Sequence, residues 1–246
     1  MSDNPRIGVT ERGDAAIDLS WANKLGNLDM AVIITKNPAK PEFQKALLEH
    51  KDKCLLHATI TGWGGSILEP NVPPYKTALD GVDALVAAGF PKDHVVIRID
   101  PIMPWNTEPS MHVFREACAR RYHRFRVSIL DEYAHTAERF HEKGLATPSD
   151  MDISPVLAVN RVNSVLHEIR FDYPDITIEA CAEPRLDAEQ KGCINPEDMA
   201  LFGLPVPEAH INGRQRRTCL CCDGKRELLT NRHPCAHGCL YCYWKN

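Results

Sequence analysis

Apolar and polar positions along the chain predict strands that alternate with helices. Apolar runs of strand length lie at 31–35, 54–62, 94–100, 124–130 and 175–181, and a weaker run lies at 226–230. Between them, apolar residues recur at helical spacing over about 41–50, 74–89, 109–122 and 152–170. Such alternation is typical of βαβ units and a parallel sheet. We therefore expect an α/β fold with six strands.

Polar residues occupy alternate positions in most of these strands. They are His57, Thr59 and Thr61, then Arg98 and Asp100, then Arg126 and Ser128, and finally Thr177, Glu179 and Cys181. A parallel sheet that is covered on both faces should be almost continuously apolar. The pattern therefore favours a partial barrel whose polar lumen opens at the C-terminal ends of the strands. A half-exposed antiparallel sheet is the alternative.

Composition indicates one globular domain over residues 1–246. The chain has 43% hydrophobic and 25% charged residues, which suits a sizeable core and excludes a disordered or collagen-like chain. It contains no run of 18 apolar residues, and Met1–Pro5 lacks the pattern of a signal peptide. We expect a cytoplasmic protein without membrane contact.

Basic residues and cysteines are concentrated in the C-terminal part, 181–246. The net charge is −4, yet residues 211–246 alone carry seven basic and two acidic residues. Eight of the ten cysteines follow residue 180, whereas Cys54 and Cys118 are isolated. In a chain without secretion features, this clustering favours a metal or cluster site over disulfides.

The last cysteines form a C-x3-C-x2-C motif made by Cys235, Cys239 and Cys242, with Tyr241 directly before the last one. Three thiolates can hold three irons of a 4Fe-4S cluster while the fourth iron keeps an open coordination position. That open iron requires a ligand from outside the protein.

This motif resembles that of the radical S-adenosylmethionine (SAM) superfamily. The resemblance implies that the amino and carboxylate groups of SAM bind the open iron. It further implies that an electron, delivered by a donor such as flavodoxin or ferredoxin, cleaves SAM and generates a 5′-deoxyadenosyl radical that abstracts hydrogen from a substrate. In such an enzyme the cofactor carries the difficult chemistry, and the protein positions groups and excludes water.

The superfamily usually carries this motif after its first barrel strand, near the N-terminus. A circular permutation would explain its C-terminal place here. The strand at 226–230 would then be the first strand, 16–26 the first helix and 31–35 the second strand. We therefore expect a permuted, partial (β/α)6 barrel of the radical SAM type.

Two closer resemblances concern the rest of the chain. Residues 59–73, 87–91 and 95–102 are similar to segments of spore photoproduct lyase, which acts on a thymine lesion in DNA. A largely uncharacterised bacterial family with C-terminal radical-SAM-like cysteines fits better. It matches in order over most of residues 30–246, at Thr35–Pro38, Arg98–Pro101, Cys181–Glu183, Gly192–Ile194, Gln215–Arg216 and the final cysteines. These resemblances imply a lyase or isomerase acting on a pyrimidine base in DNA or on a nucleotide.

The pattern of that family also includes Cys181, Cys193, Cys219 and Cys221. Four thiolates are enough for a second 4Fe-4S cluster. Two alternatives stay open, because Cys222 could replace Cys221 and because Cys181, at a strand end, could instead donate a hydrogen atom in the lumen.

Polar residues at the C-terminal strand ends are the candidate contacts for cofactor and substrate. For SAM binding they are Thr35, Lys36, Thr61, Ser128, Glu179, Glu183 and Tyr241. Arg98, Asp100 and Cys181 are the catalytic candidates. Arg98 could bind the SAM carboxylate with two parallel hydrogen bonds. The alternative for Arg98 and Asp100 is a structural ion pair across the lumen.

A second function class also fits the cysteines. Cys219-x2-Cys222 and Cys239-x2-Cys242 are 16 residues apart, a spacing typical of a zinc ribbon, although Cys235 is then unexplained. The alternative function is thus a zinc-stabilised module that binds nucleic acid without catalysis. The basic groups Arg214–Arg217 with Lys225 and Arg226, and Arg120–Arg126, could follow a phosphate backbone or form a solvated surface.

Overall fold

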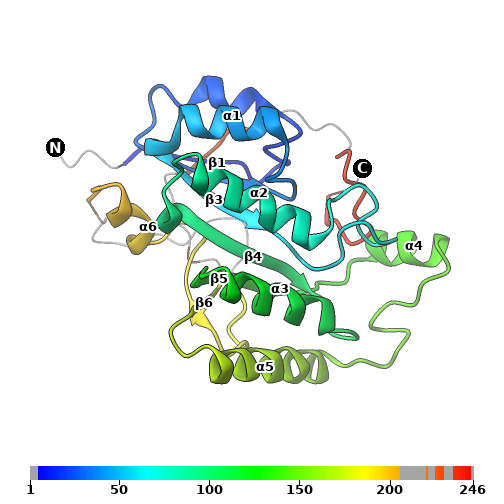
Figure 1. Cartoon of the computed structure of the whole chain (residues 1–246). Helices are drawn as coiled ribbons and strands as arrows, with labels where there is room; N and C mark the ends of the chain where they lie inside the picture. The colour runs from blue at the N-terminus through cyan, green and yellow to red at the C-terminus, as the bar shows by residue number, and fades with distance from the viewer. Residues whose placement is uncertain (1–4, 206–219, 221–224, 230–234, 245–246) are drawn as a thin grey trace.

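The protein contains one sheet of eight parallel strands. The computed structural model describes residues 5–205, 220, 225–229 and 235–244 (Figure 1). The strands are β1 (Ile7–Val9), β2 (Met30–Thr35), β3 (Cys54–Thr59), β4 (Val95–Ile102), β5 (Arg124–Ile129), β6 (Thr177–Ala180), β7 (Glu189–Gln190) and β8 (Lys225–Glu227). They lie in the order β7-β6-β5-β4-β3-β2-β1-β8. Every ladder between these strands is parallel, which confirms the α/β class and excludes the antiparallel alternative.

Helices cover one face of the sheet. The α-helices are α1 (Pro41–Glu49), α2 (Tyr75–Ala87), α3 (Glu108–Ala119), α4 (Ala134–Glu142), α5 (Pro155–Asp172) and α6 (Pro196–Leu201). From β1 to β7 the strands follow chain order without reversal, so right-handed crossovers bring the connecting helices to the same side. The main core forms there, where Ala31 and Ile33 of β2 pack with Phe43 of α1, Leu85 of α2 and Phe114 of α3.

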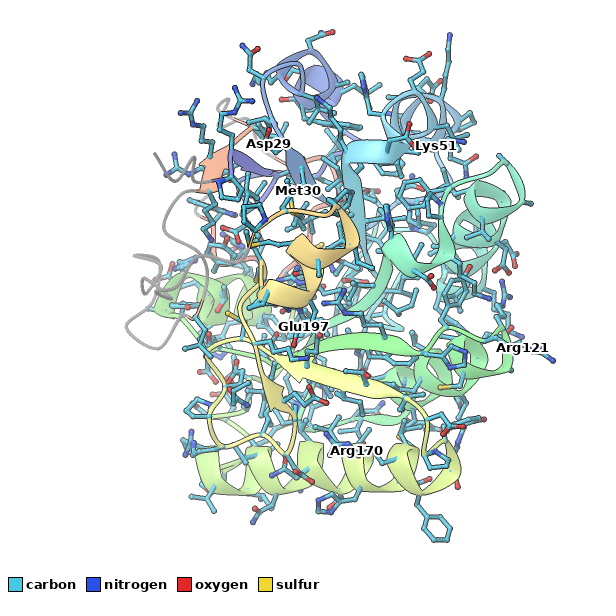
Figure 2. All side chains as sticks on the ribbon, turned by 90° about the vertical axis from the view of Figure 1, so that its left-hand side faces the viewer. Asp29, Met30, Lys51, Arg121, Arg170 and Glu197 are labelled. Carbon is cyan, nitrogen blue, oxygen red and sulfur yellow. The ribbon has the colours of Figure 1, made fainter. Side chains whose placement is uncertain are left out.

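The opposite face of the sheet carries a smaller apolar cluster. Met30, Val32 and Ile34 of β2 alternate with the core residues of the same strand and pack with Met199 of α6. In Figure 2, α6, marked by Glu197, lies on the side of the strands away from the other helices. This helix covers only part of the face, and the remainder is polar.

The predicted strand count was wrong, because the sheet has two more strands than the hydrophobic pattern indicates. β1 lies between β2 and β8, where Ile7 is paired with both Met30 and Lys225. β7 is a two-residue strand at the other edge. The helix predicted at 16–26 is a 3-10 helix over Leu19–Lys24. The partial barrel and the permutation stay predictions, since β7 and β8 are the two ends of the strand order.

The loops at the C-terminal ends of the strands form a third apolar cluster. Leu68 and Val72 follow β3, Met103 follows β4, and Phe140 belongs to α4. They pack with Cys239, Leu240 and Tyr241, so the C-terminal cysteine segment lies at this end of the sheet, beside α4 (Figure 1). No helix in the described part of the chain combines the length and apolar character needed to cross a membrane.

Candidate functional site

Three cysteines of the C-x3-C-x2-C motif lie in one segment, residues 235–244, which we call the cysteine loop. Cys235 and Cys242 are partly exposed, Cys239 is buried, and none of the three forms a disulfide. Burial raises the pKa of Cys239 to about 12, although the positive charge of Lys36 opposes this increase. Burial also raises the pKa of Cys235, against a hydrogen bond from the backbone N–H of His237. Burial therefore disfavours the ionised forms of Cys235 and Cys239.

An ion pair anchors the first half of the cysteine loop. His237 Nε2 lies 3.0 Å from Asp14 Oδ2, and His237 Nδ1 donates to the Asn71 carbonyl at 3.2 Å. The Asp14 carboxylate also accepts from the Thr35 hydroxyl at 2.7 Å and from the Lys36 backbone N–H at 2.6 Å. Burial alone would raise the pKa of Asp14, but these hydrogen bonds and the His237 charge bring it below its usual value. The pair thus ties the loop to the ends of β1 and β2.

A second buried ion pair anchors the other half of the loop. Lys36 Nζ donates to Glu69 Oε1 at 2.7 Å and to the Tyr241 hydroxyl at 2.8 Å. Tyr241 in turn donates to Glu69, which also accepts from the Thr61 hydroxyl at 2.7 Å. The side chain of Glu69 is 1% exposed, so this pair is shielded from solvent. It holds Tyr241 over the ends of β2 and β3.

The loop that follows β3, residues 62–74, contacts the cysteine loop through the backbone. Leu240 N donates to Leu68 O at 3.1 Å, and Asn71 N donates to His237 O at 3.3 Å. The Asn71 side chain donates to Ala236 O at 2.8 Å. Segments that are more than 160 residues apart in the chain are thereby aligned side by side.

The loop after β3 passes so close to itself at Gly64 that no side chain fits there. Replacing Gly64 tests whether this close approach is needed for stability. A Cβ atom at Gly64 would lie 2.0 Å from the Pro73 carbonyl oxygen, so Gly64→Ala must displace backbone. We expect a loss of about 1–3 kcal/mol in the free energy of unfolding, the usual cost of overpacking. Gly26→Ala is the matched control, because nothing lies within 4 Å of its Cβ. Equal urea midpoints for the two variants would contradict this explanation.

The polar residues predicted to share one face do lie on it, in register across four strands. Thr59 is paired with Arg98, Arg98 with Arg126, and Arg126 with Glu179. Arg98 forms an ion pair with Asp100, and Ser128 donates to the same carboxylate. The side chains of Arg98 and Asp100 are 26% and 21% exposed, so they form the accessible part of this row.

Glu179 belongs to a buried ion-pair network and not to the accessible part of the row. Its carboxylate accepts from Arg124 at 3.0 Å and also from Arg126, and its side chain is 1% exposed. Asp198 of α6 lies 2.5 Å from Arg124. Burial, followed by the charge of Arg126, holds the pKa of the adjoining His57 well below its usual value. Glu179 therefore has a structural role in this network, and its contact with SAM stays a prediction.

The other predicted SAM contacts divide between anchors and accessible groups. Thr35 and Thr61 are buried and donate to Asp14 and Glu69, respectively. Lys36 and Tyr241 are engaged with Glu69. Glu183, after β6, is partly buried. The structure thus brings Thr35, Lys36, Thr61 and Tyr241 together around the cysteine loop, whereas Arg98, Asp100 and Ser128 lie further along the sheet.

The cysteines proposed for a second cluster are only partly described. Cys181 follows β6 and Cys193 precedes α6, and both are partly exposed. The Cys193 carbonyl accepts from Arg126 at 2.9 Å. Burial, and then the negative charge of a nearby Cys193 thiolate, raise the pKa of Glu11. Cys219, Cys221 and Cys222 lie outside the described residues. Within the described ranges, no group of three or more His, Cys, Asp or Glu side chains that could hold a metal ion is found.

The basic segment Arg120–Arg126 is largely neutralised within the protein. Arg124 and Arg126 point to the polar face of the sheet, and Arg120 lies 2.7 Å from Asp80 and 2.8 Å from Asp83. Tyr122, within the same segment, is buried. These contacts disfavour the predicted nucleic-acid surface there. The other basic group, Arg214–Arg217, lies outside the described residues.

Sequence reasoning missed the residues that hold the cysteine loop. Asp14, Glu69 and Arg139 are single polar residues in loops or in a helix, and their partners are distant in the chain. Among the residues that hold the cysteine loop in place, only His237 lies within the cysteine motif that was recognised from the sequence. A buried carboxylate near a motif can be recognised from sequence only if the topology that brings it there is known.

Comparison with curated proteins and with solved structures finds no match. A family model described as a domain of unknown function, DUF1848, matches residues 19–244, which includes β2 to β8 and the cysteine loop. The match thus extends over most of the sheet and over all three cysteines of the motif. Since it covers more than half of the sequence, the chain belongs to the DUF1848 family.

Proposed function

We propose that this protein is a radical SAM enzyme that binds a 4Fe-4S cluster through Cys235, Cys239 and Cys242. One observation carries the proposal: the cysteine loop is fixed across the C-terminal ends of parallel strands by two buried ion pairs, next to the polar face that carries Arg98. Active sites of barrel-like α/β proteins lie at this end of the strands. The similarity of the motif to that of the radical SAM superfamily supports the same conclusion.

The chemistry of the three thiols fits such a cluster. The pKa of Cys239 is raised first by burial, and the charges of Glu69, Cys235 and Cys242 raise it further. Cationic irons would compensate the charge of the thiolates that hold them and so offset this effect of burial at Cys239. When bound, the cluster supplies the electron that cleaves SAM reductively. Lys36, close to Cys239, adds a positive charge that favours the thiolate form.

The accessible polar residues would bind SAM and the substrate. Arg98 has Asp100 as its partner among the described residues, which leaves guanidinium N–H groups to bind a carboxylate. Asp100 can accept hydrogen bonds from an amino or ribose group. Burial raises the pKa of Tyr243 to about 12, and the positive charge of Arg98 opposes this increase. Tyr243 of the cysteine loop therefore lies near Arg98, which would bind the SAM carboxylate.

The substrate that we propose is a pyrimidine base in DNA or a nucleotide, and the reaction is a cleavage or an isomerisation. The row of Arg98, Asp100 and Ser128 offers both donors and acceptors, as the edge of a base requires. We also propose a cytoplasmic location and an electron donor such as flavodoxin or ferredoxin. Both follow from the low-potential chemistry of the proposed cluster.

Metal and sulfide analysis of protein purified without oxygen tests this proposal. We expect iron and sulfide in equal amounts, with broad absorption from thiolate-bound iron and about four irons per chain for one cluster or about eight for two. A colourless protein with one zinc, which takes up no iron on anaerobic reconstitution, would contradict the enzyme and favour the zinc-ribbon module. Binding of SAM to the reconstituted protein is the second readout.

A further inference from the structure

Helix α4 carries a basic side chain that contacts the cysteine loop. Arg139 Nη1 donates to the Cys242 carbonyl at 2.8 Å and to the Leu240 carbonyl at 3.4 Å. Arg139 Nη2 donates to the Trp244 carbonyl at 2.7 Å. One guanidinium therefore binds three alternate carbonyl groups of the segment 240–244. A planar side chain with five N–H donors is suited to such multiple contacts, whereas lysine offers a single point charge.

Neighbouring residues of α4 strengthen this contact. His135 Nε2 lies 2.9 Å from the Tyr243 carbonyl, so His135 and Arg139 together contact the carbonyl groups of four loop residues, 240, 242, 243 and 244. Phe140 packs in the same apolar cluster as Cys239, Leu240 and Tyr241, and its ring meets Trp105 at a centroid distance of 6.0 Å. The second half of the cysteine loop is thus held between α4 and the Lys36–Glu69 pair.

The contact with Arg139 also determines where the N–H groups of the loop point. In a planar trans peptide, the carbonyl of one residue and the N–H of the next point in opposite directions. Binding the carbonyls of Leu240 and Cys242 to Arg139 therefore directs the N–H groups of Tyr241 and Tyr243 away from α4. Among the described residues, neither of these N–H groups has a hydrogen-bond acceptor.

The first half of the motif contains a hydrogen bond from a backbone N–H to a cysteine sulfur, at the position that corresponds to Tyr241 in the second half. The backbone N–H of His237 donates to Cys235, two residues before it. Tyr241 stands at the same spacing after Cys239. Hydrogen bonds to ligand sulfurs and nearby charge are among the factors that set the reduction potential of iron-sulfur clusters.

We propose that Arg139 is a positioning residue, which holds the peptide groups of residues 240–244 so that the N–H groups of Tyr241 and Tyr243 are available to the thiolates. Its effect on a cluster rests on the proposed function. Its effect on the loop does not, because every contact of Arg139 is with backbone carbonyls.

The test compares Arg139→Gln, Arg139→Lys and Arg170→Gln with the unaltered protein. Arg170 is the matched control, a partly exposed helix arginine that forms an ion pair with the Asp187 carboxylate at 3.1 Å. In metal-free protein, we expect amide hydrogen exchange in 239–244 to be about tenfold faster in Arg139→Gln, since charge-assisted hydrogen bonds are lost. Exchange in β2 to β5 should not change, which shows that the sheet stays folded.

Iron-loaded protein gives the second readout. We expect Arg139→Gln to shift the reduction potential of the cluster to more negative values and to change its electron paramagnetic resonance spectrum. Arg139→Lys should lie between Arg139→Gln and the unaltered protein, because it keeps the charge but not the planar geometry. Unchanged exchange in Arg139→Gln, or equal acceleration in Arg170→Gln, would overturn the proposal. Accelerated exchange in a protein that binds no iron would uphold the role of Arg139 in the loop and refute the proposed function alone.

Discussion

Replacing Cys235 by alanine is expected to abolish the cleavage of SAM while the sheet stays folded. The change removes one of three thiolates that would hold the cluster, and two thiolates do not fix a cluster with a defined open iron. Cys235 is partly exposed and belongs to none of the apolar clusters, so its loss should hardly affect packing. The measurement is release of methionine and 5′-deoxyadenosine from SAM by the reduced, reconstituted protein.

A second cysteine variant provides the control for this experiment. Cys118 is a buried residue of α3 in the main core, on the opposite face of the sheet from the polar row. Cys118→Ala should therefore keep both iron and SAM cleavage, although it costs some stability by leaving a small cavity. Retained cleavage in Cys235→Ala, at an iron content equal to that of Cys118→Ala, would refute the assignment of the motif.

Replacing Glu69 by alanine is expected to lower the free energy of unfolding by about 3–5 kcal/mol, the usual cost of leaving a buried charge unpaired. The reason is Lys36, whose ammonium group donates to Glu69 and whose side chain is 16% exposed. Thr61 and Tyr241 lose the same acceptor. Urea denaturation at pH 7 measures the loss, and the iron content after reconstitution should fall with it because Tyr241 is released.

Two further variants separate the unpaired charge from a general effect of truncation. Glu168→Ala removes the partner of Arg115 in a surface pair whose side chains are about half exposed, and it should cost only about 0–1 kcal/mol. Lys36→Met combined with Glu69→Ala should recover a substantial part of the lost stability, because no buried charge remains. A single variant Glu69→Ala as stable as Glu168→Ala would show that the buried pair contributes little.

The strands that could be predicted from sequence are those in which an apolar run, or an alternation of apolar and polar residues, extends over several positions. Residues 30–35 of β2 form a continuous apolar run that ends at Thr35, and in β4 the polar residues Arg98 and Asp100 alternate with apolar ones and share a face. β1 consists of Ile7, Gly8 and Val9, and β7 of Glu189 and Gln190. Segments this short carry no period, and only pairing with neighbouring strands defines them.

The candidate site could be predicted only where its chemistry is local. The spacing of Cys235, Cys239 and Cys242 is readable within eight residues, but the residues that hold them come from four separate parts of the chain. The sequence analysis left the basic segment Arg120–Arg126 open between a nucleic-acid surface and a solvated one, and it did not identify the acidic partners of these arginines. A two-residue alternation directs Arg124 and Arg126 to the same face as Glu179 on the next strand, and this partner was visible in the sequence.

The pairing of β8 with β1 has a consequence for the order of folding. Glu11 N donates to Glu227 Oε2, 216 residues away, while β2 to β6 pair with their immediate neighbours in the chain. Contacts of high sequence separation form late, because loop closure costs entropy before the contact repays it. During synthesis, the sheet from β1 to β6 can assemble before the cysteine loop leaves the ribosome. Docking of β8 would then be the last step. It would place the three thiols against the C-terminal ends of strands that are already paired.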